Sequence, residues 1–283
     1  MNKPILRCIA TLWTLTGHPA KTREWLLDKK LCAIKAAGFD GVCGSGSAEL
    51  RAGCEKHGLI FIGAMASSKP TEFSRLLRDL KKSGAHHINV QLASDAVPTP
   101  QALRLTRAVW QEGRRLGLEP AVETHRGTCT ETPEKLYALA DAFQNYTGEL
   151  LPVAWDFSHF AVVKQLAPEN FIERLLVRPE LVQRAQQFHF RPFNGHHIQV
   201  PITDDRGNLS PEVKAWLPFA GAVLRCWLAG NKNSAREIFI CPELGPVASG
   251  YALSLAPDSW EQAKVLRGEI DRLWRKILAE TKS

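Results

Sequence analysis

Eight apolar runs alternate with segments of helical periodicity along nearly the whole chain. The runs are Ile5–Trp13, Phe39–Cys43, Leu59–Met65, His87–Leu92, Leu118–Thr124, Pro152–Phe157, Gln187–Phe190 and Glu237–Pro242. Most of them are continuously apolar, which is typical of strands that are buried on both faces. Because strand-like and helix-like segments alternate, the pattern predicts a parallel sheet whose strands are connected by helices.

The segments between the runs carry helix signals of three kinds. Apolar residues recur with i, i+3, i+4, i+7 spacing in the sets Phe73/Leu76/Leu77/Leu80, Leu136/Leu139/Ala140/Phe143 and Ile270/Leu273/Trp274/Ile277. Thr132, followed by a proline and a glutamate, is typical of a helix N-cap. Four glycines stand where a helix should end before the next strand, namely Gly38, Gly58, Gly84 and Gly117.

The number of repeats and the chain length predict how this sheet closes. Eight strand–helix units in 283 residues have the size of a (β/α)₈ TIM barrel, and we expect one such domain over residues 1–283. A doubly wound open sheet is the alternative. The alternation is irregular only in Arg191–Pro211, where we expect a long loop on the catalytic face, followed by a helix over Val213–Leu228.

Composition limits the class of protein. The chain is 45% hydrophobic and 23% charged, contains no run of 18 apolar residues, and begins without the apolar region of a secretion signal. Its seven cysteines form no CxxC pair, and Cys8, Cys32 and Cys241 lie in apolar runs. We therefore expect buried thiols, a cytoplasmic protein and no membrane partner. The formal charge is +7, but the basic residues are scattered, so nucleic acid is a disfavoured partner.

Polar side chains stand at the ends of the last four predicted strands. They are Glu123, Asp156, His189 and Glu243. The carboxyl ends of barrel strands meet at one mouth, so these side chains should converge. Each one alone could be a helix cap or the partner of a surface lysine. Together, three carboxylates need a counter-charge, because each raises the pKa of its neighbours. The set predicts one divalent metal ion, namely Mn²⁺, Mg²⁺, Co²⁺ or Zn²⁺.

The strings around these residues resemble the xylose isomerase-like (β/α)₈ superfamily, which includes sugar phosphate isomerases and epimerases, inosose dehydratases and the endonuclease IV family. The strings are Val122-Glu123-Thr124-His125-Arg126-Gly127, Asp156-Phe157-Ser158-His159, Phe188-His189-Phe190-Arg191 and Pro242-Glu243-Leu244-Gly245. The resemblance implies that the same four residues hold the metal. It also implies that His159 contacts substrate or a second metal, and that Arg191 or His197 meets the substrate.

The endonuclease IV branch needs further histidines for its trinuclear zinc site. The second predicted strand ends in Val42-Cys43-Gly44, without one. His86 and His87 lie at the start of the fourth strand, which is the wrong end of the barrel. The string Gly195-His196-His197 after the seventh strand lacks the aspartate of an Asp-x-His pair. The sequence therefore disfavours a DNA-repair enzyme.

The favoured function is isomerisation or epimerisation of a small sugar or cyclitol. Glu123 and Glu243 would move the proton next to a carbonyl, and the metal would stabilise the enediolate. An inosose dehydratase-like lyase would use the same residues, and a barrel that binds a ligand without turnover is a further alternative. The expected substrate contacts are His159, Arg191, His197, Asn89, Gln91, His125 and Trp13. Barrels of this kind commonly pair, so a homo-oligomer is one expected state.

Overall fold

The computed structural model describes residues 3–232, 234–253 and 258–281. Eight parallel strands pair in chain order, and β8 pairs with β1, so the sheet closes into a barrel. The strands are β1 Ile5–Thr11, β2 Gly41–Gly44, β3 Ile60–Ser67, β4 His87–Leu92, β5 Glu119–Glu123, β6 Val153–Trp155, β7 Gln187–His189 and β8 Glu237–Cys241. The predicted (β/α)₈ barrel is confirmed, and the open sheet is wrong.

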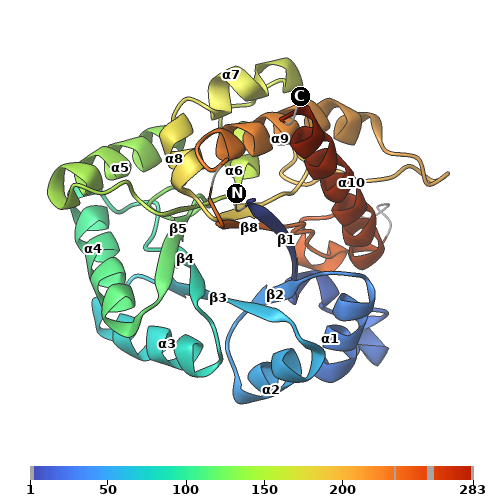
Figure 1. The fold of residues 1–283 in the computed structure, drawn as a ribbon, viewed down its shortest axis with the longest axis horizontal. Helices are drawn as coiled ribbons and strands as arrows, with labels where there is room; N and C mark the ends of the chain where they lie inside the picture. The colour runs from blue at the N-terminus through green and yellow to red at the C-terminus, as the bar shows by residue number, and fades with distance from the viewer. Residues whose placement is uncertain (1–2, 233, 254–257, 282–283) are drawn as a thin grey trace.

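The helices form an outer ring around the strands (Figure 1). They are α1 Leu27–Ala36, α2 Ala48–His57, α3 Pro70–Lys82, α4 Thr99–Leu116, α5 Pro133–Thr147, α6 Phe157–Val163, α7 Phe171–Leu175, α8 Pro179–Arg184, α9 Pro211–Ala229 and α10 Ser259–Glu280. The three periodic sets lie in α3, α5 and α10, as predicted. Periodicity did not predict the three short helices between β6 and β7. Within the described residues, no helix is long and apolar enough to span a membrane.

The predicted helix signals act as expected. The Thr132 hydroxyl accepts a hydrogen bond from the backbone N–H of Lys135 and so caps α5. Gly58 and Gly117 end α2 and α4 in the left-handed conformation, with φ of +60° and +69°. A residue with a side chain is strained at such φ values, which explains why glycine stands at both helix ends.

Alternate residues of each strand enter the barrel. Ile9, Cys43, Ile62, Phe239 and Cys241 form a small apolar cluster, separate from the main core under the helices. The same alternation puts Glu119, Ala121 and Glu123 on one face of β5, and Gln187 and His189 on one face of β7. One strand can therefore present side chains at both mouths of the barrel.

Several strands end earlier than the apolar runs predicted. Trp13 does not close β1 but begins the short 3₁₀ helix η1, Trp13–Leu15. Asp156 does not end β6; it is the N-cap of α6, where its carboxylate accepts the backbone N–H of Ser158. A carboxylate that caps a helix stops the strand at the residue before it.

The other structural expectations have mixed outcomes. The long loop after β7 is confirmed. No helix or strand lies between β7 and α9 in the described residues, where an isolated β-bridge joins Thr203 and Leu209. The prediction of a buried Cys32 is wrong, because the thiol is exposed on α1 while its neighbours Leu31 and Ile34 face the core. A helix turns by about 100° per residue, so an apolar run does not bury every member.

The barrel interior is tightly packed at Gly41. A Cβ atom at this position would lie 2.5 Å from the Ile60 carbonyl oxygen and 2.9 Å from Ile9 Cδ1. We predict that Gly41→Ala lowers the free energy of unfolding by about 1–3 kcal/mol, because backbone must shift to admit the methyl group. Gly268→Ala is the matched control, since a Cβ there meets nothing within 4 Å in α10 and should stabilise the helix by up to about 1 kcal/mol. Urea denaturation measures both, and equal effects would contradict the packing argument.

Candidate metal centre

The four predicted ligands come together at the C-terminal mouth of the barrel. Their ligand atoms all lie within 4.8 Å of one another. His189 is at the centre of the group, with Nδ1 3.2 Å from Glu123 Oε1 and 3.1 Å from Glu243 Oε2. Glu123 ends β5 and His189 ends β7, whereas Asp156 and Glu243 lie one and two residues beyond β6 and β8.

Asp156 is fixed by a network that joins β5 to α6. Its Oδ1 accepts hydrogen bonds from the Ser158 backbone N–H at 3.0 Å and from the Ser158 hydroxyl at 2.5 Å. The Thr124 hydroxyl accepts the backbone N–H of Asp156 at 2.7 Å and donates to its carbonyl at 2.9 Å. The carboxylate therefore has little freedom to turn away from the mouth.

Glu123 is fixed from two sides. Asn89 Nδ2 donates to Glu123 Oε2 at 2.7 Å, and the Thr130 hydroxyl donates to the Glu123 carbonyl at 2.5 Å. Asn89 lies in the middle of β4 rather than at its end, and it is buried. Its amide holds a carboxylate of the group, which orients that carboxylate for a ligand.

Arg191 is buried against the same group. Its guanidinium Nη2 contacts Asp156 Oδ2 and lies 3.5 Å from Glu243 Oε2. Its Nε and Nη1 atoms are buried without a hydrogen-bond partner among the described residues. Arg191 therefore supplies positive charge to the carboxylates, and it keeps N–H groups free.

Burial and charge act in opposite directions on the pKa values of four groups of the centre, namely Asp156, Glu123, His189 and His159. Burial raises the pKa of Asp156, but Arg191 and the nearby histidines outweigh it and hold that pKa below its ordinary value. Burial likewise raises the pKa of Glu123, and His189 reverses the shift, so the net pKa is lowered. Burial lowers the pKa of His189, but Glu243 and Glu123 raise it well above its ordinary value. Burial lowers the pKa of His159 to about 3, so this imidazole is neutral.

These charges fit one divalent ion. Three carboxylates and the Arg191 guanidinium leave two negative charges when His189 is neutral. A metal-bound histidine must be neutral, so a bound metal takes the place of the His189 proton. One dication then balances the group, and oxygen ligands with one imidazole suit Mn²⁺, Mg²⁺, Co²⁺ or Zn²⁺. The residues that would hold the metal are therefore Glu123, Asp156, His189 and Glu243.

Comparison with solved structures gives matches over nearly the whole chain. L-ribulose 3-epimerase superposes with a TM-score of 0.66 at 14% identity, over 98% of this chain and 97% of that chain. A xylose isomerase-like TIM barrel protein from Mycobacterium smegmatis, solved in complex with magnesium, gives 0.58 at 13%, over 96% and 98%. The probable 3-DHS dehydratase AsbF from Bacillus anthracis gives 0.58 at 13%, over 93% and 98%. No family model and no curated protein matches the sequence.

The chain shares the (β/α)₈ barrel fold of these structures, one of which is named a xylose isomerase-like TIM barrel protein. At these identities the likeness is one of fold, and the chemistry has to be argued from the side chains. In this barrel the strands that lead to the four candidate ligands are neighbours, from β5 to β8.

The predicted substrate contacts lie at different distances from the centre. His159 is buried, with Nε2 3.4 Å from Asp156 Oδ2, and the His125 ring lies 4.3 Å from the His159 ring, centroid to centroid. His197 is exposed, and its Nδ1 lies 3.3 Å from Asn194 Oδ1; no described contact joins it to the four ligands. The substrate roles of these residues stay predictions.

Gln91 and Asn89 line a cavity of about 440 Å³ at the same mouth. Ala64 and Ala66 of β3 contribute two small side chains to its wall. The volume lies within the range of about 300–1,000 Å³ that is usual for small-molecule sites. Because Asn89 also donates to Glu123, this cavity adjoins the ligand group.

An aromatic and basic cluster at this mouth was predicted only in part. It consists of Trp13, Tyr251, Arg126 and Arg191. The Tyr251 ring packs edge-on against Trp13 at 4.9 Å, and it lies under the guanidinium groups of Arg126 at 4.6 Å and Arg191 at 5.2 Å. Trp13 was a candidate, but Tyr251 and Arg126 were not assigned a role. Tyr251 lies in an irregular segment after β8, where no periodicity points to a residue.

Removing the buried positive charge should destabilise the metal-free protein. Arg191→Met leaves Asp156 and Glu243 without their guanidinium partner, and we expect a loss of about 3–5 kcal/mol in the free energy of unfolding. Arg225→Met is the control, because its pair with Glu280 is exposed and should cost about 1 kcal/mol or less. Denaturation in EDTA and then with added Mn²⁺ is the measurement. A dication should restore part of the loss in Arg191→Met; similar losses in both variants would contradict the electrostatic account.

Proposed function

We propose that the protein is a divalent-metal-dependent isomerase or epimerase of a small sugar or cyclitol. The observation that carries the proposal is a pair of glutamates, Glu123 and Glu243, on either side of His189 at one barrel mouth. Proton transfer at a carbon next to a carbonyl requires a base to remove the proton and an acid to return it. Two carboxylates at one mouth of the barrel supply both.

The two glutamates differ in their surroundings. The Glu123 side chain is 1% exposed and receives the Asn89 hydrogen bond, whereas the Glu243 side chain is 17% exposed. In the proposed reaction both glutamates transfer the substrate proton. The Glu243 carboxyl is the one that exchanges its proton with solvent. The metal, when bound, supplies positive charge that acidifies the C–H and stabilises the negative charge that develops on oxygen.

Neutral and cationic side chains would hold the substrate oxygens. The His159 imidazole is neutral, and its Nδ1 is buried without a described hydrogen-bond partner. The Nε and Nη1 groups of Arg191 are free in the same way. We propose that these groups, with Gln91 and His125, bind substrate hydroxyls, and that Trp13 forms an apolar wall. His197 would join them only by movement of its loop.

The fold neighbours support this class of chemistry without fixing the substrate. One is named an L-ribulose 3-epimerase and another was solved with magnesium. The neighbour named a probable 3-DHS dehydratase makes a lyase the second candidate, because loss of hydroxide can follow the same proton removal. DNA-repair chemistry is disfavoured, since His196 and His197 are exposed in the described loop rather than gathered at the ligand group. A non-catalytic binding barrel has no evident need for three carboxylates at its mouth.

Metal content gives the first test. Protein loaded with Mn²⁺ and dialysed should contain about one ion per chain, and Glu243→Gln should lose most of it, because one of the charged ligands is gone. Glu237→Gln is a matched control at the first residue of β8, where the carboxylate pairs with Arg7 at the other end of the barrel. Elemental analysis reads out both variants. Full metal content in Glu243→Gln, or none in the unaltered protein, would contradict the site.

Turnover gives the second test. We expect the Mn²⁺-loaded protein, incubated in D₂O with a panel of ketoses and inososes, to convert one of them, since epimerisation breaks a C–H bond next to a carbonyl. Proton NMR follows the new isomer and the loss of that C–H signal. Glu123→Gln and Glu243→Gln should each lower kcat by about 10²-fold or more, while Glu237→Gln keeps it. Loss of water from the substrate would favour the lyase, and cleavage of abasic-site DNA would overturn the proposal.

A further inference from the structure

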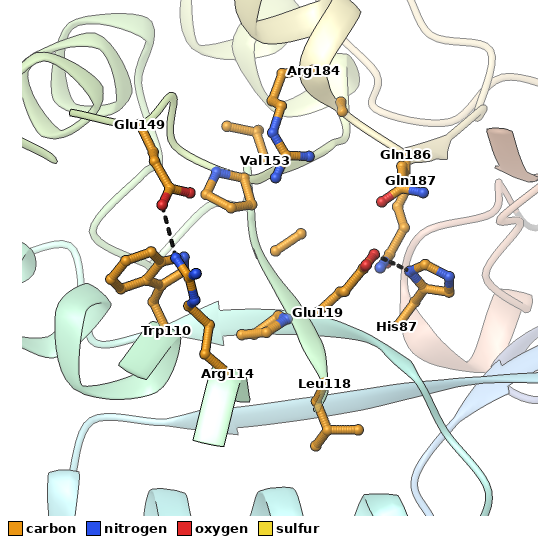
Figure 2. A pocket seen from close by; sticks show the side chains of 14 residues that line it. His87, Trp110, Arg114, Leu118, Glu119, Glu149, Val153, Arg184, Gln186 and Gln187 are labelled. Carbon is orange, nitrogen blue, oxygen red and sulfur yellow. Dashed lines mark hydrogen bonds and ion pairs between the residues drawn. The ribbon is translucent and has the colours of Figure 1, made fainter. Parts of the chain in front are cut away.

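A second cavity opens at the N-terminal end of the barrel, opposite the candidate metal centre. It has a volume of about 280 Å³ and is lined by the first residues of three strands, His87 of β4, Glu119 of β5 and Gln187 of β7. Trp110 and Arg114 of α4 and Arg184 of α8 complete its polar and aromatic wall (Figure 2). Neither the metal centre nor the proposed reaction uses these residues.

Arg184 is the unpaired charge of this cavity. It ends α8, and its side chain points into the cavity (Figure 2). Its guanidinium makes no hydrogen bond or ion pair with another described residue, and it acts on Glu119 only as a minor cause of that carboxyl's lowered pKa. Arg114, by contrast, donates to Glu149 at 2.7 Å and lies over the Trp110 ring at 4.8 Å. The Arg114 guanidinium is therefore already paired, whereas the Arg184 guanidinium has no partner among the described residues.

The negative charges of the cavity are already paired. Glu149 accepts from Arg114, and Glu119 lies 3.1 Å from His87 Nδ1 and 3.6 Å from His86 Nε2. His87 in turn packs against Phe239 of the barrel interior. With both carboxylates engaged, the group that still lacks a partner is positive, which favours an anion over a cation.

A glutamine of the same cavity has a side chain without a hydrogen-bond partner in the described part of the chain. Gln187 is 4% exposed, and its side chain makes no hydrogen bond to another described residue. It lies two residues before His189 on the inward face of β7. Gln187 lines the cavity, and its amide is open to a ligand atom or water there. Its N–H groups and the Arg184 fork can donate to one oxyanion.

We propose that this cavity is a binding site for a small organic oxyanion, with a phosphate or carboxylate group held by Arg184 and Gln187. The body of the ligand lies against Trp110, Pro120 and Pro152. The volume is just below the range of about 300–1,000 Å³ of most ligand sites, so the ligand is a compact metabolite of a few carbon atoms. The site is separate from the reaction at the other mouth.

The test is calorimetric titration of the full-length, metal-loaded protein with glycerol 3-phosphate, succinate and inorganic phosphate. At least one of them should bind at a single saturable site, and the three arms separate a phosphate ester from a dicarboxylate and from free phosphate. Arg184→Gln should weaken that binding about tenfold or more, and Gln187→Leu should weaken it by a smaller factor. Arg104→Gln is the matched control, because it removes the same charge from the exposed face of the neighbouring helix α4.

Arg126→Gln separates this site from the mouth of the metal centre, since Arg126 contacts Tyr251 there. It should leave the anion affinity unchanged. Loss of binding in Arg126→Gln but not in Arg184→Gln would overturn the proposal, as would the absence of saturable binding for all three anions. A Zn²⁺ site lost in His86→Ala, without any anion binding, would show that the cavity takes a cation instead.

Discussion

The gathering of three carboxylates around one imidazole is the constraint on which the C-terminal mouth depends. Glu123, Asp156 and Glu243 cannot remain ionised in a buried group without positive charge beside them. Arg191 provides one such charge from within the chain, and His189 takes up another as a proton. A bound dication would replace that proton. The proposed metal site thus rests on the electrostatics of the group as well as on its likeness to a known pattern.

The two ends of the barrel differ in the sign of the charge that lacks a partner, although the same strands contribute side chains to both. On β5, Glu119 and Glu123 share a face, separated by Ala121, and on β7 Gln187 precedes His189 by two residues. At the C-terminal mouth the carboxylates outnumber the fixed positive charges. At the N-terminal mouth the carboxylates are paired and Arg184 is left over. Strand alternation gives both ends inward side chains, and local charge decides which ligand each end attracts.

The fold and the convergence of the four candidate ligands could be predicted from the sequence because both follow from strand order. Apolar runs reveal buried strands, and polar residues that end consecutive runs must meet in a closed barrel. Asn89 was expected to contact the substrate, and its hydrogen bond to Glu123 was not predicted, because that bond depends on the register between β4 and β5. Arg191 was expected to contact the substrate, but its ion pairs with Asp156 and Glu243 were not predicted, and Tyr251 was not predicted at all. Their contacts are made by irregular loops, which leave no periodic signal.

The unequal burial of the two glutamates follows from where their strands end. Glu123 is the last residue of β5 and is held inside the barrel by Asn89, while Glu243 stands two residues past β8, where backbone and side chain reach the mouth. The Gly245 that follows allows Trp13 to approach, since a Cβ there would lie 2.2 Å from the indole ring. The loop after β8 therefore brings a carboxylate and an aromatic side chain to one side of the mouth. In the proposed reaction, Glu123 is the fixed partner and Glu243 is the group that reaches the substrate from the solvent side.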